Sequence, residues 1–364
     1  MKRALVIKIA VFSLLSLLVI ALLSGGYVWY TMDKTMDAMY EPLPSKAWVA
    51  PLFENEPASQ MQSTPPQTES TPNSAPVQIT HDAEPSPSRL TNASIEEQPK
   101  RELAIDNKTA ERLRHPSLKK KEPFSLLLLG VDERAGDRGR SDTMILLTIN
   151  PKKNSAIAIS IPRDTKTLMP NTGKYDKINH AYAFGGTSLS VDSVEQLFGV
   201  PIAFYMKTNM EGYVKIVDLL GGVDVTNNRD FTSVYHFPKG AQHLDGDQAL
   251  AYIRMRKEDP QGDFGRTERQ RAVLSNAVDR VTELNSIAKL PKLMSHLATN
   301  IRTNLTMQNM LDLALEYRPL IQNVETLSLK GIGETTNGIY YYSVSTKERQ
   351  RIQTELLSRL GATS

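Results

Sequence analysis

The stretch "FSLLLLGVDERAGDRGRSDTMILLTINPKKNSAIAISI", residues 124–161, contains three apolar runs in close succession. The runs cover 124–131, 143–150 and 154–161, and Gly, Asn or Pro punctuates them. Short runs that are apolar at successive positions are typical of strands buried on both faces. We therefore predict an α/β fold with a central mixed or mostly parallel sheet, covered by helices on both faces.

Helical patterns alternate with these and later strand patterns, which supports the α/β prediction. We expect one helix in "SLSVDSVEQLFG" (188–199), a strand in "IAFYMK" (202–207) and a second helix in "NMEGYVKIVDLLGG" (209–222). Asn209 is suited to cap the second helix, which should end at Gly221 and Gly222. Residues 238–254 are expected to form a loop that leads into a short helix. A capping box at Ser345 and Glu348 predicts a final helix.

Composition and charge narrow the class of protein. The 364 residues include no cysteine, which excludes disulfides and thiolate chemistry. The net charge of +3 is too small to indicate binding to nucleic acid. The chain lacks the H-E-x-x-H, G-x-S-x-G and P-loop motifs of peptidases, esterases and nucleotide triphosphatases.

The N-terminus, "MKRALVIKIAVFSLLSLLVIALLSGGYVWY", predicts a membrane anchor. Lys2 and Arg3 precede an apolar run over 9–30, which is long enough to span a bilayer. Cationic residues favour the cytoplasmic side, so 1–8 should be cytoplasmic and the rest of the chain outside the cell. A cleaved signal peptide is the alternative, although "LLSGG" is a poor cleavage site.

The region between the anchor and the apolar runs has the composition of a stalk. Eleven of the 21 prolines lie between 42 and 99, among many Ser, Thr, Gln and Glu residues. Such a segment cannot bury enough apolar surface to offset its ordering entropy. We predict a disordered stalk over 31–122, with one exposed helix over 100–114, and a catalytic core that begins at 123.

Charged residues gather where the predicted strands end. Asp132 follows the first run, Asp142 precedes the second, and Arg163 with Asp164 follows the third. Ligands of α/β sheets bind at strand ends. Each residue alone also fits a turn or a surface ion pair. Two acids at one sheet edge would suit a hard divalent ion such as Mg²⁺ or Mn²⁺.

A second group of charges lies in "YIRMRKEDPQGDFGRTERQ", residues 252–270. Helical spacing back from Val273 places Gln270 and Arg266 on the core side of a helix that begins near Gly265. A buried guanidinium needs an anion. The anion is either a phosphate, which Arg254 and Arg256 would also bind, or an internal partner such as Asp259 or Asp263.

Four stretches together resemble the LytR–CpsA–Psr family of Gram-positive envelope proteins: "LLLGVDER…GRSDTMILLTIN", "AISIPRDT", "KINHAYAFGG" and "ALAYIRMRKEDPQGDFGRTERQR". The resemblance is strong over 123–285 and weaker over 286–364, which would complete the extracytoplasmic domain with helices and strands. It implies a single-pass cell-membrane phosphotransferase. Such an enzyme moves an anionic glycopolymer, for example wall teichoic acid, from an undecaprenyl-pyrophosphate carrier to the C6 hydroxyl of N-acetylmuramic acid in peptidoglycan.

The resemblance also implies roles for individual residues. Asp132 and Asp142 correspond to metal-binding acids, and Asp263 to an acid near the pyrophosphate-binding arginines. The pyrophosphate-binding residues would be Arg163, Lys177, Arg254, Arg256, Arg266 and Gln270, and the catalytic residues Asp132, Asp142, Arg163 and Asp263. Two other functions use the same site: a polyprenyl-pyrophosphate phosphatase with water as acceptor, and a non-catalytic scaffold that binds lipid pyrophosphate.

Overall fold

The computed structural model describes residues 26, 30, 31, 33–48, 105–133, 136–255, 259, 263–283, 298–317, 320 and 324–362. Only Gly26 and Tyr30 of the predicted anchor over 9–30 are among them, so that prediction lies outside the described residues. Within the described ranges, no helix is both long enough and apolar enough to cross a membrane.

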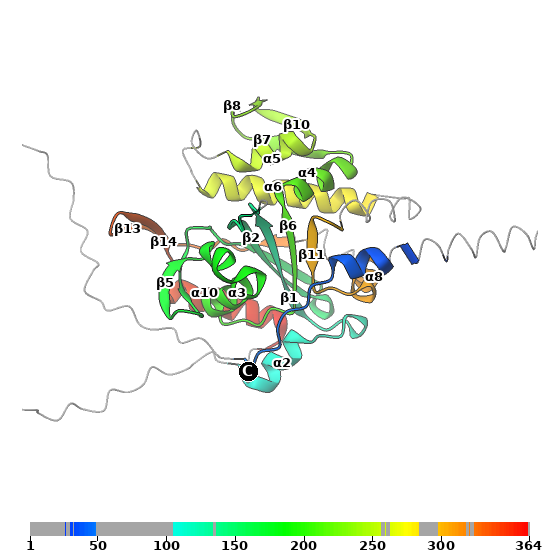
Figure 1. The fold of residues 1–364 in the computed structure, drawn as a ribbon, viewed down its shortest axis with the longest axis vertical. Helices are drawn as coiled ribbons and strands as arrows, with labels where there is room; N and C mark the ends of the chain where they lie inside the picture. Colours follow the sequence, from blue (N-terminus) through cyan, green and yellow to red (C-terminus); the bar gives the residue numbers. More distant parts are fainter. Residues whose placement is uncertain are drawn as a thin grey trace, which may run out of the picture. The chain divides into compact units, whose positions relative to one another are not determined.

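A six-stranded sheet forms the centre of the fold, with the order β11-β6-β1-β2-β3-β12 (Figure 1). The three apolar runs become β1 (Phe124–Val131), β2 (Ser141–Asn150) and β3 (Ser155–Ser160), as predicted. The fourth inner strand is β6 (Phe204–Asn209). The edges, β11 (Ile301–Thr303) and β12 (Val324–Thr326), come from the C-terminal part of the chain.

The sheet is mixed, which confirms the first of the two predicted alternatives, and the expectation that it is mostly parallel is wrong. β2 is antiparallel to both β1 and β3, and β11 is antiparallel to β6. Only β1 with β6 and β3 with β12 are parallel. The short connections from β1 to β2 and from β2 to β3 explain this, because a parallel pair needs a crossover of a dozen or more residues.

Both faces of the sheet are covered, as predicted. In β1, Leu127 and Leu129 face a cluster that includes α3 (His180–Phe198), α10 (Thr346–Leu360) and α2 (Asn107–Arg114). Phe124 and Leu126 alternate with them and face Tyr317 and α8 (Met307–Glu316). This period of two is what a strand between two helical layers requires. The buried residues therefore fix the orientation of β1 in the sheet.

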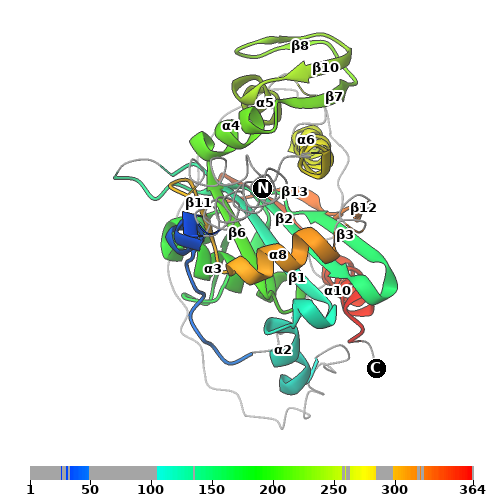
Figure 2. The same cartoon turned by 90° about the vertical axis from the view of Figure 1, so that its right-hand side faces the viewer.

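A smaller group of elements lies beyond the carboxyl ends of β1 and β6 (Figure 2). It consists of α4 (Met210–Leu219), β7 (Val223–Asn227), β10 (Gly240–Leu244), α5 (Gly246–Arg254) and α6 (Asp263–Glu283). Asn209 caps α4 by accepting the Gly212 N–H at 2.8 Å, as expected. Residues 240–244 pair with β7, so this part of the predicted loop is a strand. This smaller group of elements, together with Phe231, has an apolar cluster of its own, which includes Val217 and Tyr252.

Three hairpins complete the described fold. They are β4 (Lys166–Met169) with β5 (Lys174–Lys177), β8 (Phe231–Thr232) with β9 (His236–Phe237), and β13 (Ile332–Thr336) with β14 (Ile339–Ser343). Short 3₁₀ turns occupy Leu118–Lys120 and Pro151–Lys153. The hairpin of β4 and β5 matters for the site because it follows Arg163 in the chain.

The predicted limits of the stalk are wrong at both ends. Residues 33–39 are helical, and Met36 and Met39 are buried against Ile301 and Met307. The helix α2 forms within the predicted range, but it is not fully exposed, because Leu113 is buried in the main core. The aliphatic and aromatic residues that dock were too sparse to predict a packed segment. The part of the stalk between 49 and 104 lies outside the described residues.

Candidate functional site

Asp132 and Asp142 lie at the same end of two neighbouring strands. Val131 pairs with Ser141, and the Asp132 N–H donates to the Arg140 carbonyl at 2.9 Å. Both side chains are partly exposed. The sequence prediction required β1 and β2 to be adjacent, and they are. The antiparallel register therefore places both acids at the edge where β1 ends and β2 begins.

The loop between these acids depends on Gly139. Its φ of +67° favours glycine, and a Cβ at this position would lie 1.9 Å from the Asp132 carbonyl oxygen. Any larger residue must displace one of the two backbones. Gly139 therefore allows the loop to return close to Asp132.

Ion pairs join Asp142 to Lys177 through Arg163 and Asp164. Arg163 Nη1 lies 2.9 Å from Asp142 Oδ1, and Arg163 Nε lies 3.6 Å from Asp164 Oδ2. Lys177 Nζ lies 2.8 Å from Asp164 Oδ1. The four side chains are between 16 and 26 % exposed, so solvent screens them less than it screens surface pairs. These four residues form a row of alternating charges, the charge row, which is partly exposed to solvent.

The backbone holds this row in place. The N–H of Ile178 donates to the Thr165 carbonyl at 2.8 Å, and the N–H of Asn179 donates to the Arg163 carbonyl at 3.2 Å. The hairpin of β4 and β5 thus returns Lys177 to the residues that follow β3. Asp164 was noted in the sequence only as a possible ion-pair partner of Arg163. Its bridging position depends on the return of this hairpin, which the sequence pattern did not reveal.

The helix α6 presents Gln270 toward the start of β2 and buries Arg266. Gln270 Nε2 donates to Thr143 Oγ1 at 2.8 Å, next to Asp142 in the chain. Arg266 is one helical turn earlier on the same face and is 5 % exposed. The prediction that both residues face the core side of the helix is confirmed. Gln270 thereby connects the smaller group of elements to the edge of the sheet.

Another arginine of this stretch, Arg269, has a structural role. Its guanidinium donates to the carbonyls of Tyr252 and Met255 at 3.0 and 2.6 Å and to Asp259 Oδ2 at 2.6 Å. It also lies over the rings of Phe231 and Tyr252. Asp259, which was considered as an internal partner for Arg266, forms an ion pair with Arg269. Arg269 fixes the end of α5 against α6.

The remaining predicted residues are placed only in part. Arg254 is exposed in the last turn of α5, where a cation is favoured by the helix dipole. Arg256 and the side chain of Asp263 lie outside the described residues, although Asp263 begins α6. Among the described contacts, none joins Arg254 to the charge row. The assignments of these three residues to a ligand stay predictions.

The two aspartates fit a magnesium ion whose remaining ligands come from a substrate and water. Mg²⁺ is usually held by one or two carboxylates together with water and phosphate oxygens. Asp142 uses one oxygen for Arg163 and has a second oxygen available for other ligands. Among the described residues, no group of three or more His, Asp or Glu side chains is arranged to hold a metal ion. The donors present therefore suit a shared site and not a site made by protein alone.

The arrangement can bind and position a polyanion. Arginine guanidinium groups can bind phosphate oxygens through two parallel hydrogen bonds, and lysine binds them as a point charge. Phosphoryl transfer requires mainly such positioning and charge neutralisation. The fold and the charged sheet edge together define a class of α/β proteins in which ionised side chains gather where the strands of a mixed sheet end.

Comparison with known proteins agrees with this class. The model of the LytR_cpsA_psr family matches residues 87–358, and the chain belongs to this family. It is 47 % identical over 248 residues to "Polyisoprenyl-teichoic acid--peptidoglycan teichoic acid transferase TagU" of Bacillus mycoides (strain KBAB4), covering 68 % of this chain and 82 % of the relative.

Two solved structures extend the comparison. The crystal structure of B. subtilis TagU superposes with a TM-score of 0.54 at 42 % identity, over 66 % of this chain and 97 % of that chain. A structure of TagT bound to LIIa-WTA superposes with a TM-score of 0.58 at 32 % identity, over 69 % of this chain and 95 % of that chain. The α/β fold with a mixed central sheet is therefore shared with these relatives.

Proposed function

We propose that this protein is a phosphotransferase that attaches an anionic glycopolymer, such as wall teichoic acid, to peptidoglycan. The donor is the polymer on an undecaprenyl-pyrophosphate carrier, and the acceptor is the C6 hydroxyl of N-acetylmuramic acid. The observation that carries the proposal is the charge row from Asp142 through Arg163 and Asp164 to Lys177, at a strand end. The names of the relatives supply the substrate class.

The charge row suits pyrophosphate because its cations are already held in place. Asp164 lies between Arg163 and Lys177, which limits the side-chain freedom that either would lose on binding a ligand. Arg254, Arg256, Arg266 and Gln270 are proposed to complete the contacts to the pyrophosphate. Donors fixed before the reaction stabilise the charge that grows on the leaving phosphate.

The proposed reaction forms one bond and breaks another at the same phosphorus. The acceptor hydroxyl oxygen attacks the phosphorus that carries the glycopolymer, and the bond from that phosphorus to the bridging oxygen breaks. The carrier phosphate leaves with the electron pair, while the hydroxyl proton passes to a carboxylate, for which Asp142 and Asp263 are the candidates. When bound, Mg²⁺ would supply charge neutralisation to the phosphate oxygens, and Asp132 with Asp142 would hold it.

The membrane location is part of the proposal. The apolar run over 9–30 would hold the chain in the cell membrane as a single span, with the domain on the outer side of a Gram-positive cell. A domain on that side would have access to lipid carriers and the cell wall, and would have no access to nucleic acid in the cytoplasm. The substrate pair and the location therefore support one another.

The test incubates the full-length protein with a synthetic lipid-linked teichoic acid precursor and peptidoglycan. We expect covalent attachment of polymer to glycan, and a loss of about 100-fold or more in Arg163→Ala. Arg351→Ala is the matched control, because Arg351 also pairs with an acid, Glu348 in α10, and is not one of the proposed pyrophosphate-binding residues. Release of polymer without attachment would replace the proposal with the phosphatase, and binding without turnover would replace it with the scaffold.

A further inference from the structure

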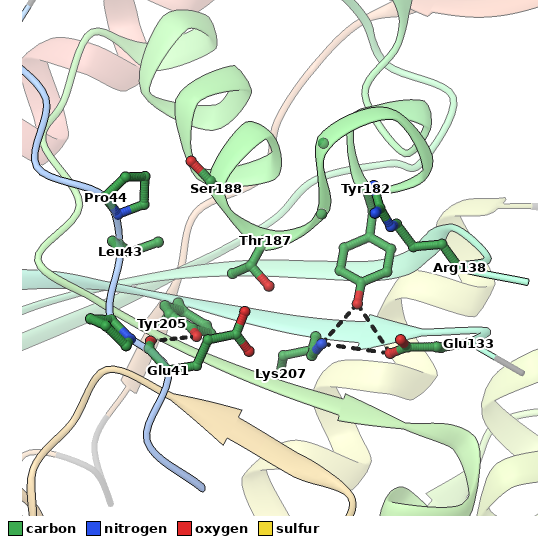
Figure 3. A pocket seen from close by; sticks show the side chains of 13 residues that line it. Glu41, Leu43, Pro44, Glu133, Arg138, Tyr182, Thr187, Ser188, Tyr205 and Lys207 are labelled. Atoms are coloured by element: carbon green, nitrogen blue, oxygen red, sulfur yellow. Dashed lines mark hydrogen bonds and ion pairs between the residues drawn. The ribbon is translucent and has the colours of Figure 1, made fainter. Parts of the chain in front are cut away.

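A second site lies beside the charge row, on the β6 side of the sheet. It is a pocket of about 340 Å³ between the first half of α3, β6, the loop after β1 and residues 41–44 (Figure 3). This volume is at the small end of the range for ligand pockets, about 300–1,000 Å³. The polar and charged lining residues used below are Glu41, Glu133, Arg138, Tyr182, Thr187 and Lys207.

Three of these side chains are fixed by one another. Lys207 Nζ donates to Tyr182 Oη at 2.8 Å, and the Tyr182 hydroxyl donates to Glu133 Oε2 at 3.1 Å. Lys207 Nζ also lies 3.5 Å from Glu133 Oε2. Burial, together with the Glu133 carboxylate, raises the pKa of Tyr182 well above its ordinary value, so its hydroxyl keeps its proton. The wall near the sheet is therefore an ordered set of donors and acceptors.

The helix α3 also contributes a buried hydroxyl without a partner among the described residues. Thr187 is 5 % exposed, and its Oγ1 has no hydrogen-bond partner among the described residues. Figure 3 shows this hydroxyl directed into the pocket, between Glu41 and Lys207. Gly186, with a φ of +64°, kinks α3 immediately before Thr187. A buried unpaired hydroxyl costs stability, so its position in a pocket indicates a ligand that supplies the partner.

The charges of the pocket select the kind of ligand. Glu41 and Glu133 balance Lys207 and Arg138, and no other described residue that lines the pocket is charged, so the lining favours neither an anion nor a cation. Hydroxyl and amide groups, which both donate and accept, can bind all four residues and Thr187. We propose that the pocket is a sugar subsite, which binds one uncharged hexosamine unit of a glycan beside the charge row. This inference rests on the proposed function, because that function brings glycans to this edge of the sheet.

The position of the pocket connects it to the reaction. Glu133 directly follows Asp132, and Arg138 belongs to the same loop, which leads into β2 and Asp142. A sugar held by Glu133 and Lys207 would therefore lie next to the proposed metal-binding acids. The glycan acceptor and the polymer donor both contain sugars, so the experiment must separate the two sources.

The test measures binding by calorimetry to the full-length protein, without lipid carrier. One arm uses a peptidoglycan disaccharide without stem peptide, and the other uses a soluble fragment of the glycopolymer. In the arm whose ligand binds, we expect Thr187→Val to weaken binding about two- to tenfold. The same change should raise the melting temperature by about 2–4 °C, because it removes an unpaired buried hydroxyl.

A matched threonine distinguishes ligand binding from a general packing effect. Thr148 is buried, but its Oγ1 lies 3.0 Å from Ser125 Oγ. Thr148→Val should therefore lower the melting temperature and leave sugar binding unchanged. Lys207→Met should weaken binding about tenfold or more, because it removes a charged donor.

Each outcome decides a separate question. Unchanged sugar binding in Thr187→Val, or no binding of either saccharide to the wild-type protein, would overturn the sugar subsite. Stronger binding of a free stem peptide than of either saccharide would overturn it too, in favour of a zwitterion site. Sugar binding without any transfer activity would defeat the proposed function and leave the subsite standing.

Discussion

Replacing Arg269 with alanine should destabilise the domain far more than replacing Arg254. The Arg269 guanidinium makes its hydrogen bonds to Tyr252, Met255 and Asp259, whose carboxylate is only 6 % exposed. Removing it leaves two carbonyls without this donor and takes the nearest cation from a buried carboxylate. Arg254, in contrast, is exposed at the end of α5.

The magnitude follows from this loss. Breaking a buried ion pair by removing one partner costs about 3–5 kcal/mol. The lower end applies here, because Arg229 Nη1 remains 3.7 Å from Asp259 Oδ1. A loss of about 3 kcal/mol should lower the melting temperature by about 6–12 °C. An exposed substitution such as Arg254→Ala usually changes stability by less than about 0.5 kcal/mol, which corresponds to about 2 °C or less.

Thermal unfolding of the purified full-length variants, measured by calorimetry under identical conditions, tests this difference. Arg269→Lys is a useful third variant, since lysine keeps the charge but cannot reproduce the planar fork of donors. It should melt between the wild type and Arg269→Ala. If Arg269→Ala melts within about 2 °C of the wild type while Arg254→Ala unfolds early, then the structural and ligand-facing roles have been assigned the wrong way round.

Three further predictions concern the metal, the anchor and acid. Transfer activity should disappear in EDTA, return with Mg²⁺ or Mn²⁺, and be lost in folded Asp132→Ala and Asp142→Ala proteins; full activity in EDTA would remove the metal from the mechanism. Protease added to intact protoplasts should remove the domain, and a protected full-length product would place it on the other side of the membrane. Hydrogen bonds from Arg351 and the Lys330 N–H lower the pKa of Glu348 below its ordinary value of 4.5. The contribution of ionised Glu348 to stability is therefore present above about pH 4.5 and is lost as pH falls through the lowered pKa. Between neutral pH and about pH 3, the melting temperature of Glu348→Gln should fall by less than that of the wild type. An equal fall in both proteins would show that Glu348 adds nothing to acid sensitivity.

The inner strands and the position of the acids could be predicted because they depend on local pattern. The runs that became β1, β2 and β3 are apolar at successive positions, and Asp132 and Asp142 flank the loop between two of them. Once the strands are neighbours, the acids must lie at one edge. The apolar pattern alone does not reveal strand direction, because a strand between two helical layers looks the same in parallel and antiparallel sheets. The short connections between these runs did indicate antiparallel pairs, and the prediction of a mostly parallel sheet overlooked them.

The arginines of residues 252–270 show a second limit. Counting back from Val273 by three and seven residues selects Gln270 and Arg266, while counting back by four selects Arg269, which lies on the same face. The difference between them depends on the carbonyls of Tyr252 and Met255, which only the fold brings near Arg269. The contacts of Glu133 with Lys207 and Tyr182 likewise depend on the pairing of β6 with β1, which the sequence pattern did not reveal.

The docking of residues 33–48 on the domain changes the role that the proline-rich region can have as a spacer. Trp48 is buried, the Arg114 guanidinium lies over its ring, and Arg114 Nη1 donates to the Lys46 carbonyl at 2.7 Å. Residues 46–48 are thus fixed to α2, the first helix on the far side of the 49–104 segment. Both ends of that segment are attached to the same helix, so its contour length does not set how far the domain can reach from the proposed anchor. If the proposed anchor spans the membrane, that reach would be set by the few residues between the anchor and Met36.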